Sequence, residues 1–505
     1  MPALCPRLLA VAILWWAALP VFAQGALSYR ESSNGLQVPG LDAGRTEIEF
    51  GDVNGDGNVD LVSIGDHGSP RINTQEHGVM VWFGDGLGNW SLFQNGNFGY
   101  GGVALGDVNN DGRMDVGYGM HHNYSSNHFG DRLLGVALGD GSGKKWKPWD
   151  RGVATSGETY GMFGTDFADV NNDGFLDLGS TSFGCCAGVH VYLNNHDGTW
   201  AQSFGFLGGN GLDDFLFADF NGDGNPDLAT ANSKGTVYLG DGAGVFTLSD
   251  GNLPHVPNLG RPGISAGDVN DDGRDDLAFV NSSGGLAVWS MVANGVWQDL
   301  SGSLPSSGRF EATQIADMNL DGHGDVVAFG RGTVSVYTGD GQGNWTLATS
   351  FATPGRQGYA AFRAGIDVDH NGFPDIGIVA AESGGINHLR VYVESSTPDQ
   401  PRIYPSTARG EAVLVPGSVR RLEWTAAVPR GAGDATIALE WSADGANGPW
   451  QTIAEAVPDN GSYQWQVPRT LADARQCYIR YRLLIGGTEV ATATALRPYA
   501  VRPGR

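Results

Sequence analysis

Short apolar stretches separated by polar turns recur along most of this 505-residue chain. Runs such as GVALG at 102–106 and VYLG at 237–240 are too short for helices and are typical of β-strands. A tight Gly-Asp-Gly turn follows such a run in VWFGDGLGNW at 81–90 and in VYTGDGQGNW at 336–345, and an aromatic residue then opens the next strand. The pattern predicts an all-β protein built from hairpins.

A nine-residue acidic loop interrupts these strands seven times, at 52–60, 107–115, 169–177, 219–227, 268–276, 317–325 and 367–375. Oxygen-bearing side chains stand at loop positions 1, 3, 5 and 9, and a Gly at position 6 lets the chain turn back sharply. A hard cation such as Ca²⁺ needs to collect six or seven oxygens, and position 7 would contribute only its backbone carbonyl. Up to seven Ca²⁺ ions are therefore expected.

The predicted ligands are these residues: Asp52, Asn54, Asp56, Asn58, Asp60, Asp107, Asn109, Asp111, Arg113, Asp115, Asp169, Asn171, Asp173, Phe175, Asp177, Asp219, Asn221, Asp223, Asn225, Asp227, Asp268, Asn270, Asp272, Arg274, Asp276, Asp317, Asn319, Asp321, His323, Asp325, Asp367, Asp369, Asn371, Phe373 and Asp375. An EF-hand would need a carboxylate at position 12 and flanking helices. Position 12 is never acidic here, and the flanking stretches have strand character, so the EF-hand is set aside.

Successive loops start 55, 62, 50, 49, 49 and 50 residues apart, and a period of this length made of short strands indicates a propeller. Each unit should hold an inner strand, the acidic loop, a second strand, a third strand, a hairpin and an outer strand. The seventh unit has no comparable outer strand, whereas residues 27–40 have that pattern ahead of the first loop. We therefore expect the N-terminal strand to complete the last blade and close the ring.

The repeats resemble the FG-GAP or VCBS family, the calcium-loop propeller repeats of integrin α-subunit heads, some fungal lectins and many secreted bacterial proteins. The resemblance covers roughly residues 27–396 and implies a seven-bladed β-propeller over residues 24–396. It does not specify function, because the family includes adhesins, lectins and lyase-associated modules.

The two ends of the chain differ from the repeats. Residues 1–23 have Arg7, an apolar run and small residues before Gln24, which predicts a cleaved signal peptide and a secreted protein, extracellular, periplasmic or attached to a cell surface. No later segment is apolar enough to predict a transmembrane helix. A linker is expected at 397–406, and alternating strands at 407–505 predict a β-sandwich that resembles immunoglobulin or fibronectin type III modules, which implies a spacer, an anchor or a secretion tag.

The formal net charge of −25 disfavours nucleic-acid partners, whose phosphates need Lys and Arg. Much of the acidity belongs to the loops, so seven Ca²⁺ ions would neutralise a large part of it. An extracellular glycan or a protein remains as the expected ligand. The oligomeric state stays open.

The candidate ligand site lies on the face opposite the acidic loops, where the connections between second and third strands are long in the first two units. The candidate residues are His67, Arg71, His121, His122, His128, Asp131, Tyr160, Cys185 and Cys186. Three of the histidines could instead bind a transition metal, or the loops could simply pack. Adjacent Cys185 and Cys186 suggest a vicinal disulfide in an exported protein, with two free thiols as the alternative.

No nucleophile elbow, zinc-protease helix or phosphate-binding loop occurs in the sequence. The preferred interpretation is a non-catalytic binding or adhesion protein. The alternative is an extracellular polysaccharide-degrading enzyme, a lyase or hydrolase, on the same scaffold. A third class, a self-associating structural component, also remains open.

Overall fold

The computed structural model describes residues 27–36, 47–65, 78–96, 98–99, 101–119, 122–123, 134–153, 162–182, 188–208, 215–257, 263–354, 361–381, 387–406, 412–471 and 476–502. Every regular element in this part of the chain is a β-strand, and most strands belong to four-stranded antiparallel sheets. The prediction of an all-β fold is confirmed.

Between residues 29 and 394, the described residues form seven four-stranded sheets, each with an inner, a second, a third and an outer strand in that spatial order. The first four are β2 (Ile48–Gly51), β3 (Asp60–Ile64), β4 (Val79–Gly84), β5 (Trp90–Asn95); β7 (Val103–Gly106), β8 (Asp115–Gly119), β10 (Leu134–Gly139), β11 (Trp146–Pro148); β12 (Met162–Ala168), β13 (Asp177–Ser182), β14 (Gly188–Asn194), β15 (Trp200–Leu207); and β16 (Phe215–Ala218), β17 (Asp227–Asn232), β18 (Gly235–Gly240), β19 (Phe246–Leu248).

The other three are β20 (Ile264–Gly267), β21 (Asp276–Val280), β22 (Leu286–Ala293), β23 (Val296–Asp299); β24 (Ala312–Ala316), β25 (Asp325–Phe329), β26 (Thr333–Gly339), β27 (Trp345–Ala352); and β28 (Phe362–Ile366), β29 (Asp375–Ala381), β30 (Asn387–Glu394), β1 (Tyr29–Glu31). A small extra pair joins β6 (Phe98–Gly99) to β9 (His122–Asn123).

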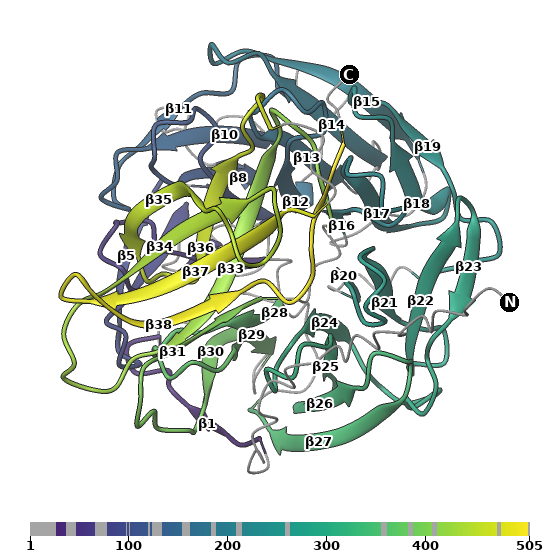
Figure 1. Cartoon of the computed structure of the whole chain (residues 1–505). Coiled ribbons are helices and arrows are strands. Elements are labelled where there is room, and N and C mark those ends of the chain that lie inside the picture. The colour runs from purple at the N-terminus through teal and green to yellow at the C-terminus, as the bar shows by residue number, and fades with distance from the viewer. Residues whose placement is uncertain are drawn as a thin grey trace, which may run out of the picture.

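The inner strands are neighbours in chain order, from β2 and β7 through to β24 and β28, and β28 also lies next to β2. Figure 1 shows the sheets spread around a common centre, with the outer strands at the rim. The fold is propeller-like, and we refer to these sheets together as the ring.

The last sheet combines the two ends of the ring. β1 pairs antiparallel with β30, with Tyr29 opposite Glu394 and Glu31 opposite Tyr392. The expected pairing of the N-terminal strand with the last unit is confirmed. Because β1 covers the edge of β30, no backbone edge of that strand is left for another chain to join.

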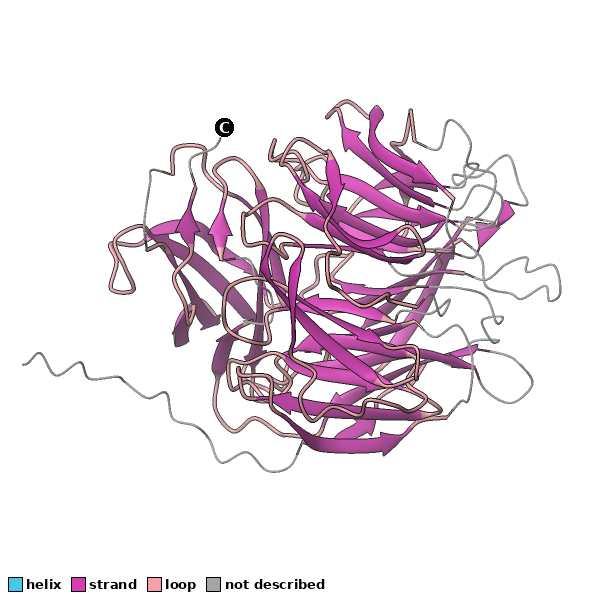
Figure 2. Ribbon diagram, turned by 90° about the vertical axis from the view of Figure 1, so that its right-hand side faces the viewer, coloured by secondary structure: helices cyan, strands magenta, loops and turns pink. Residues whose placement is uncertain are grey.

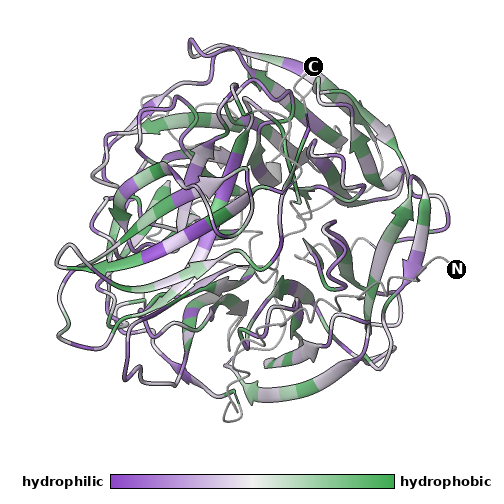
Figure 3. Ribbon diagram, viewed as in Figure 1, coloured by the Kyte–Doolittle hydropathy of each residue, from purple (hydrophilic) through white to green (hydrophobic). Residues whose placement is uncertain are grey.

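Packing between neighbouring sheets explains why the middle strands do not alternate between apolar and polar residues. β3 is buried along its whole length: Leu61 packs with Val391 of the seventh sheet, whereas Val62 packs with Val103 of the second. Each sheet thus has a neighbour on both faces, and both need apolar side chains. Figure 3 shows the resulting concentration of hydrophobic residues on the strands of the ring.

The aromatic residue that opens most outer strands links adjacent sheets. The Trp90 indole N–H donates to the Ser32 carbonyl at 2.8 Å, and the Trp345 indole N–H donates to the Leu300 carbonyl at 2.9 Å. Both rings are buried. A buried Trp supplies a large apolar area while its single polar atom finds an acceptor, so these side chains fix one sheet against the next.

Residues 402–406, 412–471 and 476–502 form a second group of sheets, which we call the C-terminal unit. Its strands are β31 (Arg402–Pro405), β32 (Val413–Leu414), β33 (Val419–Ala427), β34 (Ala435–Ser442), β35 (Gln451–Pro458), β36 (Ser462–Gln466), β37 (Tyr478–Ile485), β38 (Thr488–Thr494) and β39 (Ala500–Val501).

One sheet of the C-terminal unit has the order β31-β33-β36 and the other has the order β35-β34-β37-β38. Trp424 and Trp465 from the first sheet share one hydrophobic core with Leu439 and Tyr481 from the second. β31 lies in the segment expected to be a linker and pairs with β33. Figure 2 shows this unit standing on one side of the ring.

Candidate metal centres and the surfaces of the ring

Each acidic loop joins an inner strand to a second strand, as predicted. Position 1 directly follows the inner strand and position 9 is the first residue of the second strand; in the first sheet these are Asp52 after β2 and Asp60 at the start of β3. Position 6 has a left-handed backbone, for example φ 89° at Gly57. Glycine adopts that conformation without the strain a Cβ would add.

The same hydrogen bonds wrap the backbone around two carboxylates in every loop. In the first loop, Asp52 accepts from the backbone N–H groups of Gly55 at 2.7 Å and Gly57 at 2.9 Å. Asp60 accepts from the N–H of Val53 at 3.0 Å and from that of Gly84, at the end of β4, also at 3.0 Å. The bond from position 6 to position 1 and the bond from position 2 to position 9 recur in all seven loops.

Burial raises the pKa of these carboxyl groups. It raises the pKa of Asp60 and Asp115 at position 9 to about 8, and that of Asp219 and Asp317 at position 1 to about 7, with further upward contributions from neighbouring carboxylates. At the other five position 9 residues, Asp177, Asp227, Asp276, Asp325 and Asp375, burial raises the pKa well above its usual range. Buried carboxylates this close together need a proton or a cation to neutralise them.

The seventh loop brings its acidic groups closest together. One carboxylate oxygen from each of Asp367, Asp369 and Asp375 lies within 4.8 Å of the others, the only acidic trio that meets this limit among the described residues. Arg30 binds Asp369 Oδ2 at 3.0 Å, while Oδ1 of Asp369 is buried and has no hydrogen-bond partner among the described residues. That oxygen is available to a cation.

An arginine or a histidine reaches the position 5 carboxylate in three loops. Arg113 lies 2.5 Å from Asp111, Arg274 pairs with Asp272, and His196 lies 3.0 Å from Asp173. The two arginines occupy position 7 of their own loops. Because these pairs are partly exposed, they are weak and can rearrange around a metal ion. The donor set of two buried carboxylates, one exposed carboxylate and an amide fits Ca²⁺, which prefers oxygen ligands.

The C-terminal unit covers the face of the ring that carries the acidic loops. Three of its contacts are to a position 1 carboxylate. The Asn460 side chain donates to Asp52 at 3.3 Å, and the backbone N–H of Val419 donates to Asp169 at 2.9 Å. Arg497 donates to Asp268 at 2.9 Å.

The remaining contacts are mostly to loop carbonyl oxygens. The Gln464 side chain binds both backbone groups of Asp107, and Arg420 donates to the Gly224 carbonyl at 2.5 Å. The Val428 N–H donates to the His370 carbonyl at 2.9 Å. Arg497 also reaches the Gly322 carbonyl at 3.5 Å. The C-terminal unit therefore touches all seven acidic loops.

The inner strands surround a cavity of about 230 Å³ at the centre of the ring. The residue three positions before each acidic loop lines it in every sheet, namely Glu49, Ala104, Asp166, Leu216, Ser265, Gln314 and Ala364. Trp424, Gly461 and Ser462 of the C-terminal unit also line it. The Arg363 Nε donates to Glu49 at 2.9 Å.

Glu47 is a buried carboxyl group beside this cavity. It accepts from the N–H groups of Val103 at 3.0 Å and Thr165 at 3.2 Å, so it ties the first sheet to the second and third. Burial raises the pKa of Glu47 well above its usual range, against a lowering effect from Arg363.

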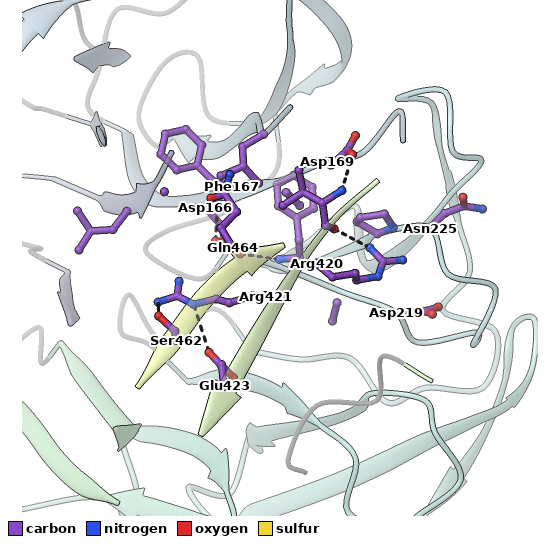
Figure 4. Close-up of a pocket in the computed structure, with 18 of the residues that line it drawn as sticks. Asp166, Phe167, Asp169, Asp219, Asn225, Arg420, Arg421, Glu423, Ser462 and Gln464 are labelled. Carbon is purple, nitrogen blue, oxygen red and sulfur yellow. Dashed lines mark hydrogen bonds and ion pairs between the residues drawn. The ribbon is translucent and has the colours of Figure 1, made fainter. Parts of the chain in front are cut away.

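A second cavity, of about 160 Å³, lies between the ring and the C-terminal unit. Figure 4 shows Asp166 and Asp169 of the ring on one side and Arg420, Arg421 and Glu423 of β33 on the other. Arg421 donates to Ser462 at 3.1 Å. Polar groups from both parts of the chain therefore line the contact between them.

The predicted ligand-site residues lie outside the described residues, with one exception in the backbone of β9, which contains His122. The structure therefore does not test the predicted vicinal disulfide or the placement of the other candidates, which are His67, Arg71, His121, His128, Asp131, Tyr160, Cys185 and Cys186. Cys477, the free cysteine among the described residues, is buried.

Two groups of residues were not anticipated from the sequence. The first is the set of C-terminal side chains on the loops, for which the sequence offers no repeated pattern. The second is the lining of the central cavity, and here the sequence holds a signal. One lining residue stands three positions before each acidic loop, and four of these residues, Glu49, Asp166, Ser265 and Gln314, are polar residues within inner strands.

Four segments of the chain match the FG-GAP-like repeat family: residues 52–118, 219–279, 268–328 and 317–378. Each match starts at position 1 of one acidic loop and runs past the end of the next. FG-GAP-like repeats are thus present, in agreement with the resemblance noted from the sequence. No curated protein matches this chain.

Solved structures give distant matches. A lectin from Agrocybe aegerita that recognises non-reducing terminal N-acetylglucosamine is 20% identical over 61% of this chain and 80% of its own, with a TM-score of 0.40. BBS1N, solved in complex with ARL6DN, is 11% identical over 73% of this chain and 96% of its own, with a TM-score of 0.43. The periplasmic gluconolactonase PpgL of Pseudomonas aeruginosa is 13% identical over 70% and 98%, with a TM-score of 0.38. These scores are too low to say what this chain binds.

In the part of the chain that the structure describes, no helix is long and apolar enough to cross a membrane.

Proposed function

We propose that this chain is an exported, calcium-loaded, seven-bladed β-propeller with a C-terminal β-sandwich, acting as a non-catalytic binding or adhesion protein. Seven four-stranded sheets with neighbouring inner strands support the propeller over residues 24–396. The core shared by the two C-terminal sheets supports the sandwich. The predicted signal peptide supports export, and extracellular calcium is abundant enough to fill sites of modest affinity.

Calcium would be held by positions 1, 3, 5 and 9 and by the position 7 carbonyl of each loop. Bound there, Ca²⁺ neutralises carboxylates that repel one another. The chain's own part is to hold those carboxylates: position 6 donates to position 1, and position 9 accepts from the backbone N–H groups of position 2 and, in most loops, of the third strand. The raised pKa of the buried carboxyl groups supports a cation requirement.

The observation that carries the choice of binding face is the contact of the C-terminal unit with every acidic loop. A partner of the ring would therefore use the opposite face. β3 ends at Ile64 and β4 begins at Val79, both at the strand ends farthest from the acidic loop, and β8 and β10 leave a similar interval after Gly119 and before Leu134. Long connections in adjacent units are typical of binding surfaces.

The ligand we propose is an extracellular glycan or protein, recognised by the candidate residues in these long connections. Histidine, arginine, tyrosine and aspartate offer the hydrogen-bond donors and acceptors that hydroxyl-rich sugars require. An enzyme with its site on this face remains the alternative, and the experiment below separates the two.

The test is a binding screen of residues 24–505 on immobilised glycans and matrix proteins, with released product assayed in the same wells. Binding without product, weakened about tenfold or more by His121→Ala with His122→Ala, would support the proposal. His255→Ala, at an exposed histidine outside the candidate connections, is the control and should bind normally. Product release would overturn the non-catalytic assignment, and normal binding by the double variant would overturn the proposed face.

A further inference from the structure

We propose that calcium loading and the docking of the C-terminal unit are coupled, so that the filled loops form its docking surface and removing calcium releases it. The inference rests on the proposed calcium role of the loops. It assigns the C-terminal unit a function other than spacer, anchor or secretion tag: it closes the loop-side mouth of the central cavity while the loops are loaded.

The contacts of the C-terminal unit depend on the shape of the loops. Arg469 donates to the Asp173 carbonyl at 2.9 Å, and Arg502 donates to the Asp223 carbonyl at 2.8 Å. These carbonyls belong to position 5, in the middle of the turn that would wrap around the ion. A loop that relaxes when its carboxylates lose their cation moves these acceptors away from their donors.

The position 6 glycines also connect the shape of the loops to the docking of the C-terminal unit. A Cβ added to Gly174 would lie 2.8 Å from the Gly417 carbonyl and 2.3 Å from the Gln466 side chain. A Cβ on Gly372 would lie 2.7 Å from the Cβ of Ala427. Gly112 is the exception, because a Cβ there would meet nothing within 4 Å. The turn of most loops is thus a contact surface as well as the bend that gathers the ligands.

If charge attraction alone held the C-terminal unit, calcium would weaken its docking, because arginines would bind empty acidic loops more strongly than filled ones. Only Arg497 among the C-terminal arginines pairs with a position 1 carboxylate, Asp268, whereas Arg420, Arg469 and Arg502 donate to loop carbonyls. The Val428 N–H donates to the His370 carbonyl, and the Val419 N–H, a neutral donor, binds the Asp169 carboxylate. Arg497 also pairs with Asp271, and Asp459 lies 3.6 Å from His370, but the donors to loop carbonyls outnumber these pairs. Most of the interface therefore depends on the shape of the loops, which favours docking on loaded loops.

Docking also closes the central cavity. Trp424, Gly461 and Ser462 line it together with the inner strands. Release of the C-terminal unit would remove these three residues from the lining and open the cavity on the side of the acidic loops. Calcium would thus control access to the interior of the ring.

The experiment is amide hydrogen exchange on residues 24–505, with calcium and with a chelator, read at Val419 and Val428. Both amides donate to loop atoms, so undocking exposes them while their own sheet stays paired. We expect chelation to speed their exchange roughly tenfold or more, in line with typical coupling between two sites. The amides of the β37–β38 hairpin, inside the C-terminal unit, should keep their protection.

A pair of matched variants tests the coupling without a chelator. Gly174→Ala and Gly112→Ala place the same methyl group at position 6 with similar backbone angles, φ 98° and 83°. Only the first drives the methyl group into the C-terminal unit. In calcium, Gly174→Ala should speed exchange at Val428, which contacts a different loop, and Gly112→Ala should not.

The outcomes are distinct. If chelation speeds exchange of the loop amides but leaves Val419 and Val428 protected, the coupling is wrong and the calcium role stands. If calorimetry detects no calcium binding, both fail. If the amides of β37 and β38 lose protection together with Val419, chelation unfolds the C-terminal unit, and the two glycine variants decide. Equal exchange rates at Val428 in Gly174→Ala and Gly112→Ala would then overturn the coupling.

Discussion

The ring and the C-terminal unit are stabilised in different ways. In the ring, one set of contacts recurs seven times over short sequence distances, such as the bond from position 6 to position 1 of each loop. Each contact of the C-terminal unit with the ring uses a different group: an amide at Asn460, a backbone N–H at Val419 and a guanidinium at Arg497. Repeated local contacts leave a pattern in the sequence, whereas single long-range contacts do not.

The largest expected effect is on the ring alone. Chelating calcium should lower the Tm of the ring by roughly 10 °C or more, because each site would contribute about 2.7 kcal/mol when free calcium exceeds its Kd by a factor of about 100. Differential scanning calorimetry with calcium and with a chelator measures this. Adding Ca²⁺ back should restore the Tm, and Mg²⁺ should restore little, since it demands a stricter octahedral site. An unchanged Tm would contradict the calcium assignment.

A single loop should show a smaller effect of the same kind. Asp317 accepts from the N–H of Gly322 at 2.9 Å, and burial raises its pKa to about 7. Asp317→Asn should remove one site's share of the calcium-dependent stability, about 2.7 kcal/mol at saturating calcium. Calcium titrations followed by thermal unfolding measure that share. Asp340→Asn, at an exposed residue in the hairpin of the same sheet, should leave it unchanged, and equal losses would argue against a site at Asp317.

Most of the ring could be predicted because its information is local. The loop reading DVNGDGNVD and the GDG hairpin each specify a turn, and the strands between them are too short to be helices. The interval of about fifty residues then implied a repeating four-stranded unit. Even the pairing of the N-terminal strand with the last unit, seen between β1 and β30, followed from one missing strand at one end and one extra strand at the other.

The docking of the C-terminal unit could not be predicted in the same way. The Asn460 and Asp52 side chains meet across 408 residues of chain, and no periodicity relates them. Glu47 was also missed, because a single acidic residue before a strand does not indicate whether it will be buried. Only the folded ring places it against Val103 and Thr165.

Glu47 makes the stability of the ring depend on pH. The pKa of Glu47 is raised in the folded state. The folded state therefore keeps a proton that the unfolded chain releases above about pH 4.3. As a result, Glu47 lowers the stability of the fold as the pH rises from about 4.3 toward the raised pKa. Glu47→Gln should therefore stabilise the ring by on the order of 1 kcal/mol near neutral pH and have little effect near pH 4. Urea unfolding across pH 4–8, in saturating calcium, measures this difference.

The control for this variant carries the opposite sign. Glu49→Gln removes the carboxylate that binds the Arg363 guanidinium, and leaving that half-buried cation without its charged partner should destabilise the ring. If both variants shift stability in the same direction at neutral pH, the two glutamates act as one charge cluster, and the separate role of Glu47 would be wrong.

The smallest expected effect is on the interior of the C-terminal unit, which should not respond to calcium at all. Cys477 is fully buried, and burial raises its pKa to about 11, so both access and thiolate content are low. A thiol reagent at pH 8 should leave Cys477 unmodified with calcium and with chelator, and should modify it only in denaturant, as read by peptide mass spectrometry. Protection in chelator while the ring loses its calcium-dependent stability would establish two separately stabilised parts. If the thiol reagent modifies Cys477 in chelator without denaturant, the C-terminal unit needs the loaded ring in order to stay folded. Its core would then open whenever its contacts with the acidic loops are lost.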